Sequence, residues 1–309
     1  MQGHLALLKR LGNTHENESF IREEIRKKEA GERGEDRLLV KLGELRLLGT
    51  FRIISDVALH EGDWKVQIDC LVVTDRCCIV LESKNMSGDL NFDTSTEEFY
   101  RLEGNNLETP FPNPYFQLMR NIRFMKDLLR RSFPELQVTG AIVMTSKSCR
   151  IRNKPSHYPV FKLESIIEKI IHMYNHSSPD FLSDKQLATL EHMIRGEQSK
   201  FTYPPLCEHY RISPNDLIRG VECPHCGVLG MKRLSTTWTC LACKKNHRYA
   251  HISAVNDYFL LIKKEITNKE IRRFCGIESI YSASRMLNKM NLEAHGSGPG
   301  RYFTQKSDK

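Results

Sequence analysis

The chain has 309 residues, more than a typical single domain, so we expect more than one folded unit. Its composition, 40% hydrophobic and 27% charged, is that of a globular protein and excludes a largely disordered or fibrous chain. The longest uncharged apolar stretches, such as residues 77–81, are too short to cross a bilayer, and no cleavage site follows the apolar N-terminus. We therefore expect a soluble, cytoplasmic protein with no signal peptide and no membrane partner.

The net charge of +8 is concentrated toward the C-terminus. Residues 221–309 hold 15 Lys and Arg against 7 Asp and Glu, whereas residues 1–220 hold 31 of each kind. A basic segment on a neutral body is typical of a protein that binds a polyanion, although solvated surface lysines would give the same count. We expect the basic segment to contact DNA.

Six of the ten cysteines are scattered along the chain, several of them inside apolar runs. Scattered cysteines in a chain of this length are typical of reduced thiols used as small apolar side chains, not of a disulfide framework. This usage favours the cytoplasm. The six are Cys70, Cys77, Cys78, Cys149, Cys207 and Cys275.

The first chemically informative residue stands in a charged, helical segment at residues 16–48. Glu35 lies at the head of an apolar stripe that includes Leu38, Leu42 and Leu45 at helical spacing. An acidic residue near a helix start also complements the helix dipole. By itself, the position of Glu35 therefore favours a structural role over a catalytic one.

Three strand-like runs follow, at residues 51–59, 65–74 and 77–83. Because side chains alternate along a strand, we expect Gln67 and Asp69 on one face. Glu82 and Lys84 share one face of the next strand for the same reason. If these two strands pair as a hairpin, Asp69, Glu82 and Lys84 converge beside the sheet, with Gln67 next to them.

Such a cluster has a definite chemistry. Two neighbouring carboxylates repel one another, and a divalent cation with oxygen ligands removes that penalty. Mg²⁺ (or Mn²⁺) held by Asp69 and Glu82 would polarise a phosphodiester, while Lys84 orients the attacking water or stabilises negative charge. The pattern indicates phosphodiester hydrolysis, but the spacing alone is a weak signal because Glu-x-Lys is frequent on protein surfaces.

The segments GERGEDRLL, QIDCLVVT, IVLESKNMSGDL and NPYFQLMRN resemble, in order and spacing, the NERD (nuclease-related) domain of the PD-(D/E)XK nuclease superfamily. The resemblance covers roughly residues 30–145. It implies a restriction-endonuclease-like αβββαβ core in an α/β domain. The two helices of that core would lie at residues 32–48 and 114–131, and its last strand at residues 138–144.

The same resemblance implies roles for individual side chains. Asp69, Glu82 and Lys84 take the positions of the family's metal and water ligands. Glu35 falls on the helix-borne acidic position, and Gln67 and Gln117 match the family's glutamines. Activity is implied at the level of the superfamily, so an inactive member is left open.

Two CxxC pairs, separated by 13 residues, lie inside the basic segment. Each CxxC forms a turn that directs two sulfurs to one point, and four thiolates complete a tetrahedral, structural Zn²⁺ site. His225 and His247 are alternative ligands, and a thioredoxin-like redox role lacks its βαβ context. The pattern resembles zinc ribbons, with the ligands Cys223, Cys226, Cys240 and Cys243.

Three helices and a Gly-rich hairpin follow residue 251, an order that resembles the winged helix-turn-helix family. The third helix, at residues 279–290, is expected to bury Ile280, Ala283, Leu287 and Met290. The resemblance implies that this helix enters the major groove of DNA and that a wing follows it. The same fold also serves as a protein–protein module. The implied DNA contacts are Ser282, Arg285 and Lys289 on the helix and Arg301 on the wing.

We therefore predict a multidomain chain whose function is that of a metal-dependent DNA endonuclease, targeted to DNA by its basic tail. Two alternatives remain: a non-catalytic DNA-binding or regulatory protein with a degenerate nuclease fold, and a protein-interaction adaptor in a DNA-processing complex. No small-molecule cofactor is expected, and a homodimer is left open.

The predicted parts of the chain are a helical extension at 1–29, the nuclease-like domain at 30–160, a helical connector at 161–220, the zinc ribbon at 221–250 and the winged-helix-like domain at 251–309.

Overall fold

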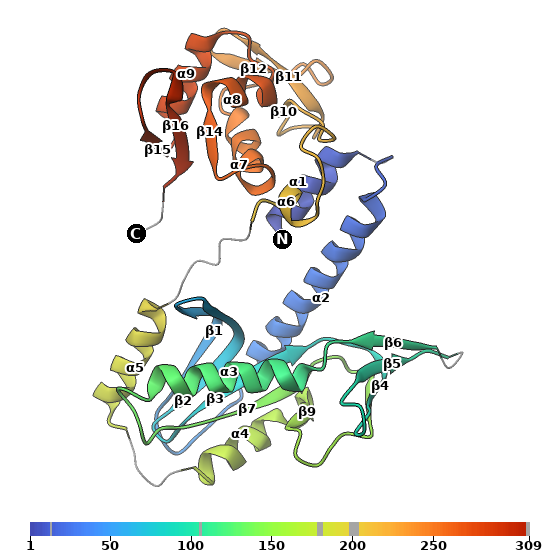
Figure 1. Cartoon of the computed structure of the whole chain (residues 1–309), viewed down its shortest axis with the longest axis vertical. Helices are drawn as coiled ribbons and strands as arrows, with labels where there is room; N and C mark the ends of the chain where they lie inside the picture. Colours follow the sequence, from blue (N-terminus) through green and yellow to red (C-terminus); the bar gives the residue numbers. More distant parts are fainter. Residues whose placement is uncertain (13, 105–106, 178–181, 198–203, 307–309) are drawn as a thin grey trace. The chain divides into compact units, whose positions relative to one another are not determined.

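The computed structural model describes residues 1–12, 14–104, 107–177, 182–197 and 204–306, which form two compact units (Figure 1). The first unit joins residues 1–28 to the described residues after 203, and the second unit spans residues 29–201. Helix α2 (Glu18–Leu42) contributes to both units, because Ile21 lies in the core of the first and Leu38 in the core of the second. The two ends of the chain therefore fold together.

The second unit is built on a five-stranded sheet of order β1-β2-β3-β7-β9. The first three strands are antiparallel to one another, and β7 and β9 continue the sheet in parallel. The strands are β1 (Phe51–Glu61), β2 (Trp64–Thr74), β3 (Cys77–Lys84), β7 (Gln137–Met144) and β9 (Val160–Lys162).

Helices cover both faces of this sheet. Figure 1 shows α3 (Pro114–Leu129) lying across one face, where α5 (Asp184–Gly196) also packs. The other face carries α2 and α4 (Ile166–Asn175), the latter after a 3₁₀ turn, η1 (Leu163–Ser165). Because both faces are covered, the apolar run of β3 is buried without alternation. The order α2-β1-β2-β3-α3-β7 is the αβββαβ core expected from the sequence.

A second, smaller sheet has the order β6-β5-β4-β8. Its strands β4, β5 and β6 lie between β3 and α3 in the chain, and β8 lies between β7 and β9. Its core is aromatic, with the rings of Phe92 and Phe99 4.6 Å apart. Tyr115, in the first turn of α3, stacks on Tyr158 at 3.8 Å, which ties the start of α3 to this part of the fold. The strands are β4 (Gly88–Phe92), β5 (Phe99–Leu102), β6 (Glu108–Phe111) and β8 (Cys149–Arg152).

The C-terminal part of the first unit contains two more sheets around three helices. Trp238 is fully buried in the core that they share with Val255, Ile271 and Leu287, so the predicted zinc ribbon and winged-helix segments have one common core. The sheets have the orders β10-β11-β12-β13 and β14-β16-β15. The elements are β10 (Val221–Glu222), β11 (Leu229–Leu234), β12 (Thr237–Thr239), β13 (Asn246–His247), α7 (His251–Leu261), β14 (Glu265–Thr267), α8 (Asn268–Cys275), α9 (Ile280–Lys289), β15 (Leu292–His295), η2 (Gly298–Gly300) and β16 (Tyr302–Gln305).

The predicted helical connector at 161–220 does not form a part of its own. Its helices α4 and α5 pack on the sheet of the second unit, whereas α6 (Leu206–His209) packs with α1 (Gln2–Leu11) in the first unit. The apolar faces of α4 and α5 are buried against the sheet, whereas in a solvated connector these faces would be exposed. Among the described residues, no helix combines the length and the apolar character that a membrane crossing requires.

A buried ion pair joins α1 to α7 inside the first unit. The side chain of Arg10 is 0% exposed, and its Nε donates to Asp257 Oδ2 at 2.8 Å. Its Nη1 donates to the carbonyl oxygens of Ile218 at 3.0 Å and Gly220 at 3.3 Å, and its guanidinium lies 4.5 Å from the ring of Phe274. A charge in this position is tolerated because these groups replace most of its water; only Nη2 has no hydrogen-bond partner among the described residues.

Replacing Asp257 with Ala should destabilise the first unit strongly. The substitution leaves the Arg10 cation buried without its carboxylate, which costs about 3–5 kcal/mol. Urea unfolding of the Asp257→Ala variant, followed by Trp fluorescence, measures the change. The exposed Asp216 provides the matched control, and Asp216→Ala should unfold as the wild type does. Equal midpoints for both variants would contradict the role given to the Arg10–Asp257 pair.

Candidate functional site

The predicted acidic residues meet where β2 and β3 cease to be paired. The register pairs Cys70 with Leu81, and its continuation by one residue places Asp69 opposite Glu82. Asp69 Oδ2 accepts a hydrogen bond from the backbone N–H of Ser83 at 2.7 Å. Glu82 is only 1% exposed although it carries a carboxylate. The structure thus brings Asp69 and Glu82 together at one position of the sheet.

Lys84 lies on the same face as Glu82 and binds it directly. Lys84 Nζ donates to Glu82 Oε1 at 2.6 Å and to Gln117 Oε1 at 3.1 Å. The predicted face-sharing of Glu82 and Lys84 therefore agrees with the structure, and Gln117 reaches the pair from α3. The lysine is held by two oxygen acceptors, which fixes its ammonium group beside the carboxylate.

Asn121 belongs to this cluster, and sequence reasoning assigned it no role. It is 2% exposed, and its Nδ2 donates to the carbonyl of Gln67 at 3.1 Å and lies 3.4 Å from Glu82 Oε2. A signal was present: Asn121 is one helical turn after Gln117, so both polar side chains occupy the sheet-facing side of α3. A buried amide on an otherwise apolar helix face requires partners, and the acidic cluster supplies one.

Glu35 is brought to the cluster by the close approach of α2 to the sheet. A Cβ on Gly34 would lie 2.8 Å from both Asn85 Cβ and Thr145 Oγ1, so only glycine allows this contact. The helix is held there by Asn85, whose Nδ2 donates to the carbonyl of Ala30 at 2.7 Å. The neighbouring Glu35 is half-buried as a result.

The three carboxyl groups influence one another's ionisation. Burial raises the pKa of Glu82 to about 7; the neighbouring Asp69 adds to the increase, and Lys84 opposes it. Burial also raises the pKa of Asp69, against the favourable charge of Lys84 and the N–H of Ser83. The pKa of Glu35 is raised as well, first by burial and then by the charge of Asp69. Perturbed carboxyl groups that share one site are typical of functional sites.

The expected alternation of β2 fails at this point of the strand. Asp56 has a φ of 51°, in the left-handed region, and the residue register on either side of it pairs Ser55 with Cys70 and Val57 with Ile68. Ile68 packs in the core under α3, whereas Cys70 packs in the core under α2, so successive even residues face opposite sides. Gln67 and Asp69 are therefore not related by simple alternation.

Gln67 contributes to the site in a different way from the one expected. Its side-chain Nε2 donates to Asp56 Oδ1 at 3.3 Å, and its main-chain carbonyl accepts from Asn121. Its assignment to the catalytic set stays a prediction.

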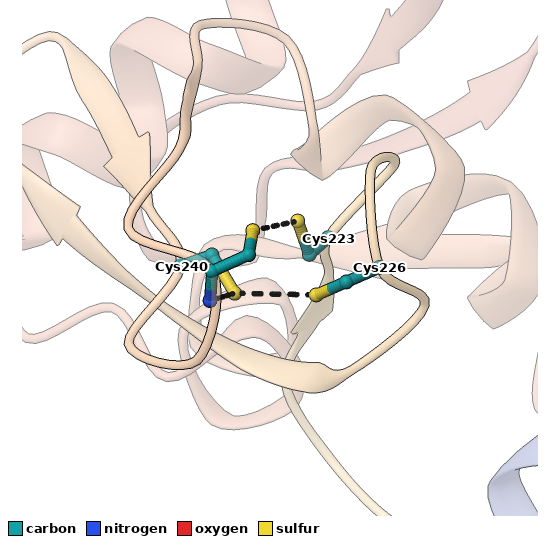
Figure 2. A group of neighbouring side chains, drawn as sticks. Cys223, Cys226 and Cys240 are labelled. Carbon is teal, nitrogen blue, oxygen red and sulfur yellow. Dashed lines mark hydrogen bonds between the residues drawn. The ribbon is translucent and has the colours of Figure 1, made fainter.

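The four predicted zinc ligands converge at the other candidate site, in the first unit. Figure 2 shows the labelled thiols Cys223, Cys226 and Cys240, and all four ligand sulfurs lie within 4.8 Å of one another. Cys223 Sγ is 3.6 Å from Cys243 Sγ, and Cys226 Sγ is 3.6 Å from Cys240 Sγ. A tetrahedron with Zn–S bonds of about 2.3 Å has edges of about 3.8 Å, so the spacing is compatible with a structural zinc ion.

The backbone around each CxxC turn directs its thiols inward. The N–H of Cys223 donates to the carbonyl of Val228 at 2.9 Å, and the N–H of Cys240 donates to that of Lys245 at 3.0 Å. Each turn is followed by a residue in the left-handed region, Gly227 at φ 73° and Lys244 at φ 62°. The two turns are therefore built alike. Among the described residues, these cysteines form the one group of three or more acidic, His or Cys side chains close enough to share an ion.

Three of the predicted DNA contacts lie on α9, and Arg301 lies in the connection between β15 and β16, directly before β16. Arg285, Lys289 and Arg301 are exposed, whereas Ser282 is half-buried. Ile280, which we expected to be buried, is 56% exposed, and Met286 is buried at 5% exposure instead. Because α9 begins only at Ile280, after its cap at Ser279, the first residue projects outside the packed face of the helix.

Residues 30–145 match the family model of the nuclease-related domain (NERD). All six predicted catalytic residues fall within this segment. No curated protein and no solved structure matches the chain. The chain thus contains a NERD nuclease-related domain, followed by a four-cysteine cluster compatible with a zinc ribbon.

The buried carboxyl of Glu82 should make folding stability depend on pH. Its pKa in the folded protein, about 7, exceeds its ordinary value of 4.5, so stability falls as pH rises from about 4.5 to about 7. Glu82→Gln removes this dependence, and the melting temperature of the variant minus that of the wild type should increase between pH 5 and pH 8. We expect a change of several degrees, since about 1 kcal/mol shifts the melting temperature by about 2–4 °C.

Differential scanning calorimetry across this pH range measures the effect. The exposed Glu61 gives the control, and Glu61→Gln should differ from the wild type by the same small amount at every pH. A constant difference for Glu82→Gln would contradict the raised pKa.

The purified protein should contain one equivalent of zinc bound by the four cysteines. Cys240→Ser should lose the ion and the cooperative unfolding of the first unit, because the metal supplies much of the folding free energy of a small ribbon. Elemental analysis and calorimetry test both effects. Cys149→Ser, in the second unit, should keep the zinc; full zinc content in Cys240→Ser would overturn the assignment.

Proposed function

We propose that the protein is a metal-dependent DNA endonuclease whose catalytic site is formed by Asp69, Glu82 and Lys84. The observation that carries this proposal is the burial of Glu82 beside Asp69, with Lys84 bound to it, inside a nuclease-related domain. Burial raises the pKa of both carboxyl groups, and the charge of Asp69 raises that of Glu82 further, which is unfavourable without a function. A phosphodiesterase site accounts for the cost.

The donor set fits a hard divalent cation. Asp69 and Glu82 supply carboxylate oxygens, and Mg²⁺ uses one or two protein carboxylates and completes its shell with water and phosphate oxygens. When bound, Mg²⁺ or Mn²⁺ would supply Lewis-acid polarisation of the phosphodiester and a more acidic water. Asp69 and Glu82 are the proposed ligands, and Glu35 is the third acidic group beside them.

Lys84 is positioned to act on the reacting groups. An ammonium group has three donors, and Glu82 and Gln117 accept two of them. The third is directed to neither, so it can hold a water in place or stabilise charge on a phosphate oxygen. Gln117 and Asn121 are positioning residues, because they hold Lys84 and Glu82 rather than the substrate.

We propose that the basic tail targets this site to DNA. The order α7-β14-α8-α9-β15-β16, with an antiparallel sheet beside three helices, agrees with a winged helix-turn-helix. In that arrangement α9 is the recognition helix, and its exposed Arg285 and Lys289 would contact DNA, with Arg301 on the wing. Ser282 is half-buried, so its contribution would be smaller than that of the cations.

A second candidate function is DNA binding without cleavage. Both oxygens of Glu82 have partners, Lys84 and Asn121. Among the described residues, the carboxylates of Glu35, Asp69 and Glu82 are not all close enough to one another to share one ion. This arrangement favours a neutral or lysine-paired Glu82 in the absence of a metal. A cleavage assay separates the two functions.

The wild-type protein should nick or cut plasmid DNA in Mg²⁺ or Mn²⁺ and not in EDTA. Asp69→Asn, Glu82→Gln and Lys84→Met should each reduce the rate by about 100-fold or more, because each removes a charge from the site. Gel electrophoresis measures the rate, and an electrophoretic mobility shift should show unchanged DNA binding. Glu61→Gln should cleave normally. Cleavage that survives all three substitutions would exclude this site, and DNA binding without metal-dependent cleavage would favour the second function.

A further inference from the structure

Arg233 occupies an unusual position for a cation in the zinc-ribbon segment. It lies on β11 directly opposite Trp238 of β12, and its guanidinium is 5.3 Å from the Trp238 ring. Met231, two residues earlier, is buried in the core shared with α9. Because side chains alternate along a strand, Arg233 points to that same side, at the edge of the core.

The guanidinium of Arg233 has buried donors without partners. Its Nε and Nη1 are inaccessible to solvent and make no hydrogen bond within the part of the chain that the structure describes. Buried donors of this kind are rare in folded proteins, and each one requires an explanation. Arg233 as a whole is only half-buried, so a turn of its side chain would present these donors to a ligand that supplies acceptors.

The groups around Arg233 are neutral or positive. Burial lowers the pKa of Arg233 first, and the charges of Arg248 and Arg285 lower it further. The Nδ1 of His251 accepts a hydrogen bond from Trp238 Nε1 at 3.2 Å. The pKa of His251 is lowered to about 4, by burial first and then by the charge of Arg233, so His251 is neutral at pH 7. No ion pair to any of the three arginines is found among the described residues.

The composition of the ribbon leaves no acid to compensate these charges. Residues 221–250 contain five Lys and Arg and a single acid, Glu222. Glu222 already pairs with Lys9 of α1. The ribbon itself therefore has no second acid that could pair with Arg233 or Arg248.

We propose that Arg233, Arg248 and Arg285 together bind a backbone phosphate of DNA, so that the ribbon and α9 form one continuous DNA-binding surface. The proposal rests on the proposed DNA binding by α9 and extends it to the ribbon, which zinc would otherwise only stabilise. Arg233 comes from the ribbon strand β11, Arg248 from the turn directly after β13, and Arg285 from α9.

Phosphate suits this cluster better than a protein carboxylate does. Guanidinium groups bind phosphate oxygens with paired, charge-assisted hydrogen bonds, and a phosphate has enough oxygens to accept from several arginines. The polyanionic backbone also screens the repulsion among the three cations. Arg285, in the middle of α9, would then hold this helix and the ribbon in register on the same strand of DNA.

Fluorescence polarisation with a labelled DNA duplex, on the full chain at several salt concentrations, tests this surface. Arg233→Met, Arg248→Met and Arg285→Met should each weaken DNA binding by about tenfold. Each should also reduce the slope of log Kd against log salt by about one. Lys264→Met removes the same charge from an exposed position outside the cluster and serves as the control.

A second readout separates ligand binding from packing. In the absence of DNA, Arg233→Met should melt at or above the wild-type temperature, because it removes a buried cation that lacks a partner. A lower melting temperature together with wild-type DNA affinity would mean that Arg233 only packs on Trp238, and would overturn the proposal. Arg248 is exposed, so Arg248→Met keeps the test decisive if Arg233→Met loses its zinc.

The outcomes also distinguish this proposal from the one on which it rests. A wild-type protein that binds no DNA would contradict DNA targeting as a whole. Wild-type binding that is weakened by Arg285→Met, while Arg233→Met and Arg248→Met match Lys264→Met, would overturn only the role of the ribbon.

Discussion

The burial of the Glu82 carboxyl is the constraint on which the second unit, which contains the nuclease-related domain, depends. An acidic group with 1% exposure needs donors, and Lys84 and Asn121 provide them from β3 and α3. Its neighbour Asp69 makes the position less favourable still, because the like charge of Asp69 raises the pKa of Glu82. The surrounding sheet, covered by helices on both faces, supplies the stability that this arrangement removes.

The first unit also contains buried charges, but they are positive. Arg10 is buried with its carboxylate partner and stabilises the contact between α1 and α7. Arg233 is partly buried without one, and its nearest charges are other cations. A paired buried charge is part of the architecture, whereas an unpaired one indicates a ligand. The four cysteines are a third case, because their sulfurs are close enough to require an ion or to remain as protonated thiols.

Much of this site was accessible from the sequence because its signals are local. The apolar runs of β2 and β3 and the tight turn between them determine which residues face one another, so Asp69 and Glu82 could be paired in advance. The CxxC turns have a geometry of their own, and the spacing of Cys223 to Cys243 was enough to predict their convergence. The capping box that Thr267 and Glu270 form at the start of α8 is another local feature of this kind.

Other features depend on residues far apart in the chain, and no local pattern could reveal them. The left-handed conformation of Asp56 interrupts the alternation of β2. Aspartate is enriched at positive φ, but it adopts this conformation too rarely for the sequence to locate the interruption. The role of Asn121 depends on which face of α3 meets the sheet. The sequence alone predicted the strand-like runs, the cysteine cluster and the meeting of Asp69, Glu82 and Lys84, since period and spacing are properties of neighbouring residues. The αβββαβ order and the place of Glu35 in the site came from the resemblance to the NERD domain. Only the tertiary structure decided that α1 joins the C-terminal unit, that α4 and α5 cover the sheet, and that Arg233 lies among cations, because burial is a property of the whole packed chain.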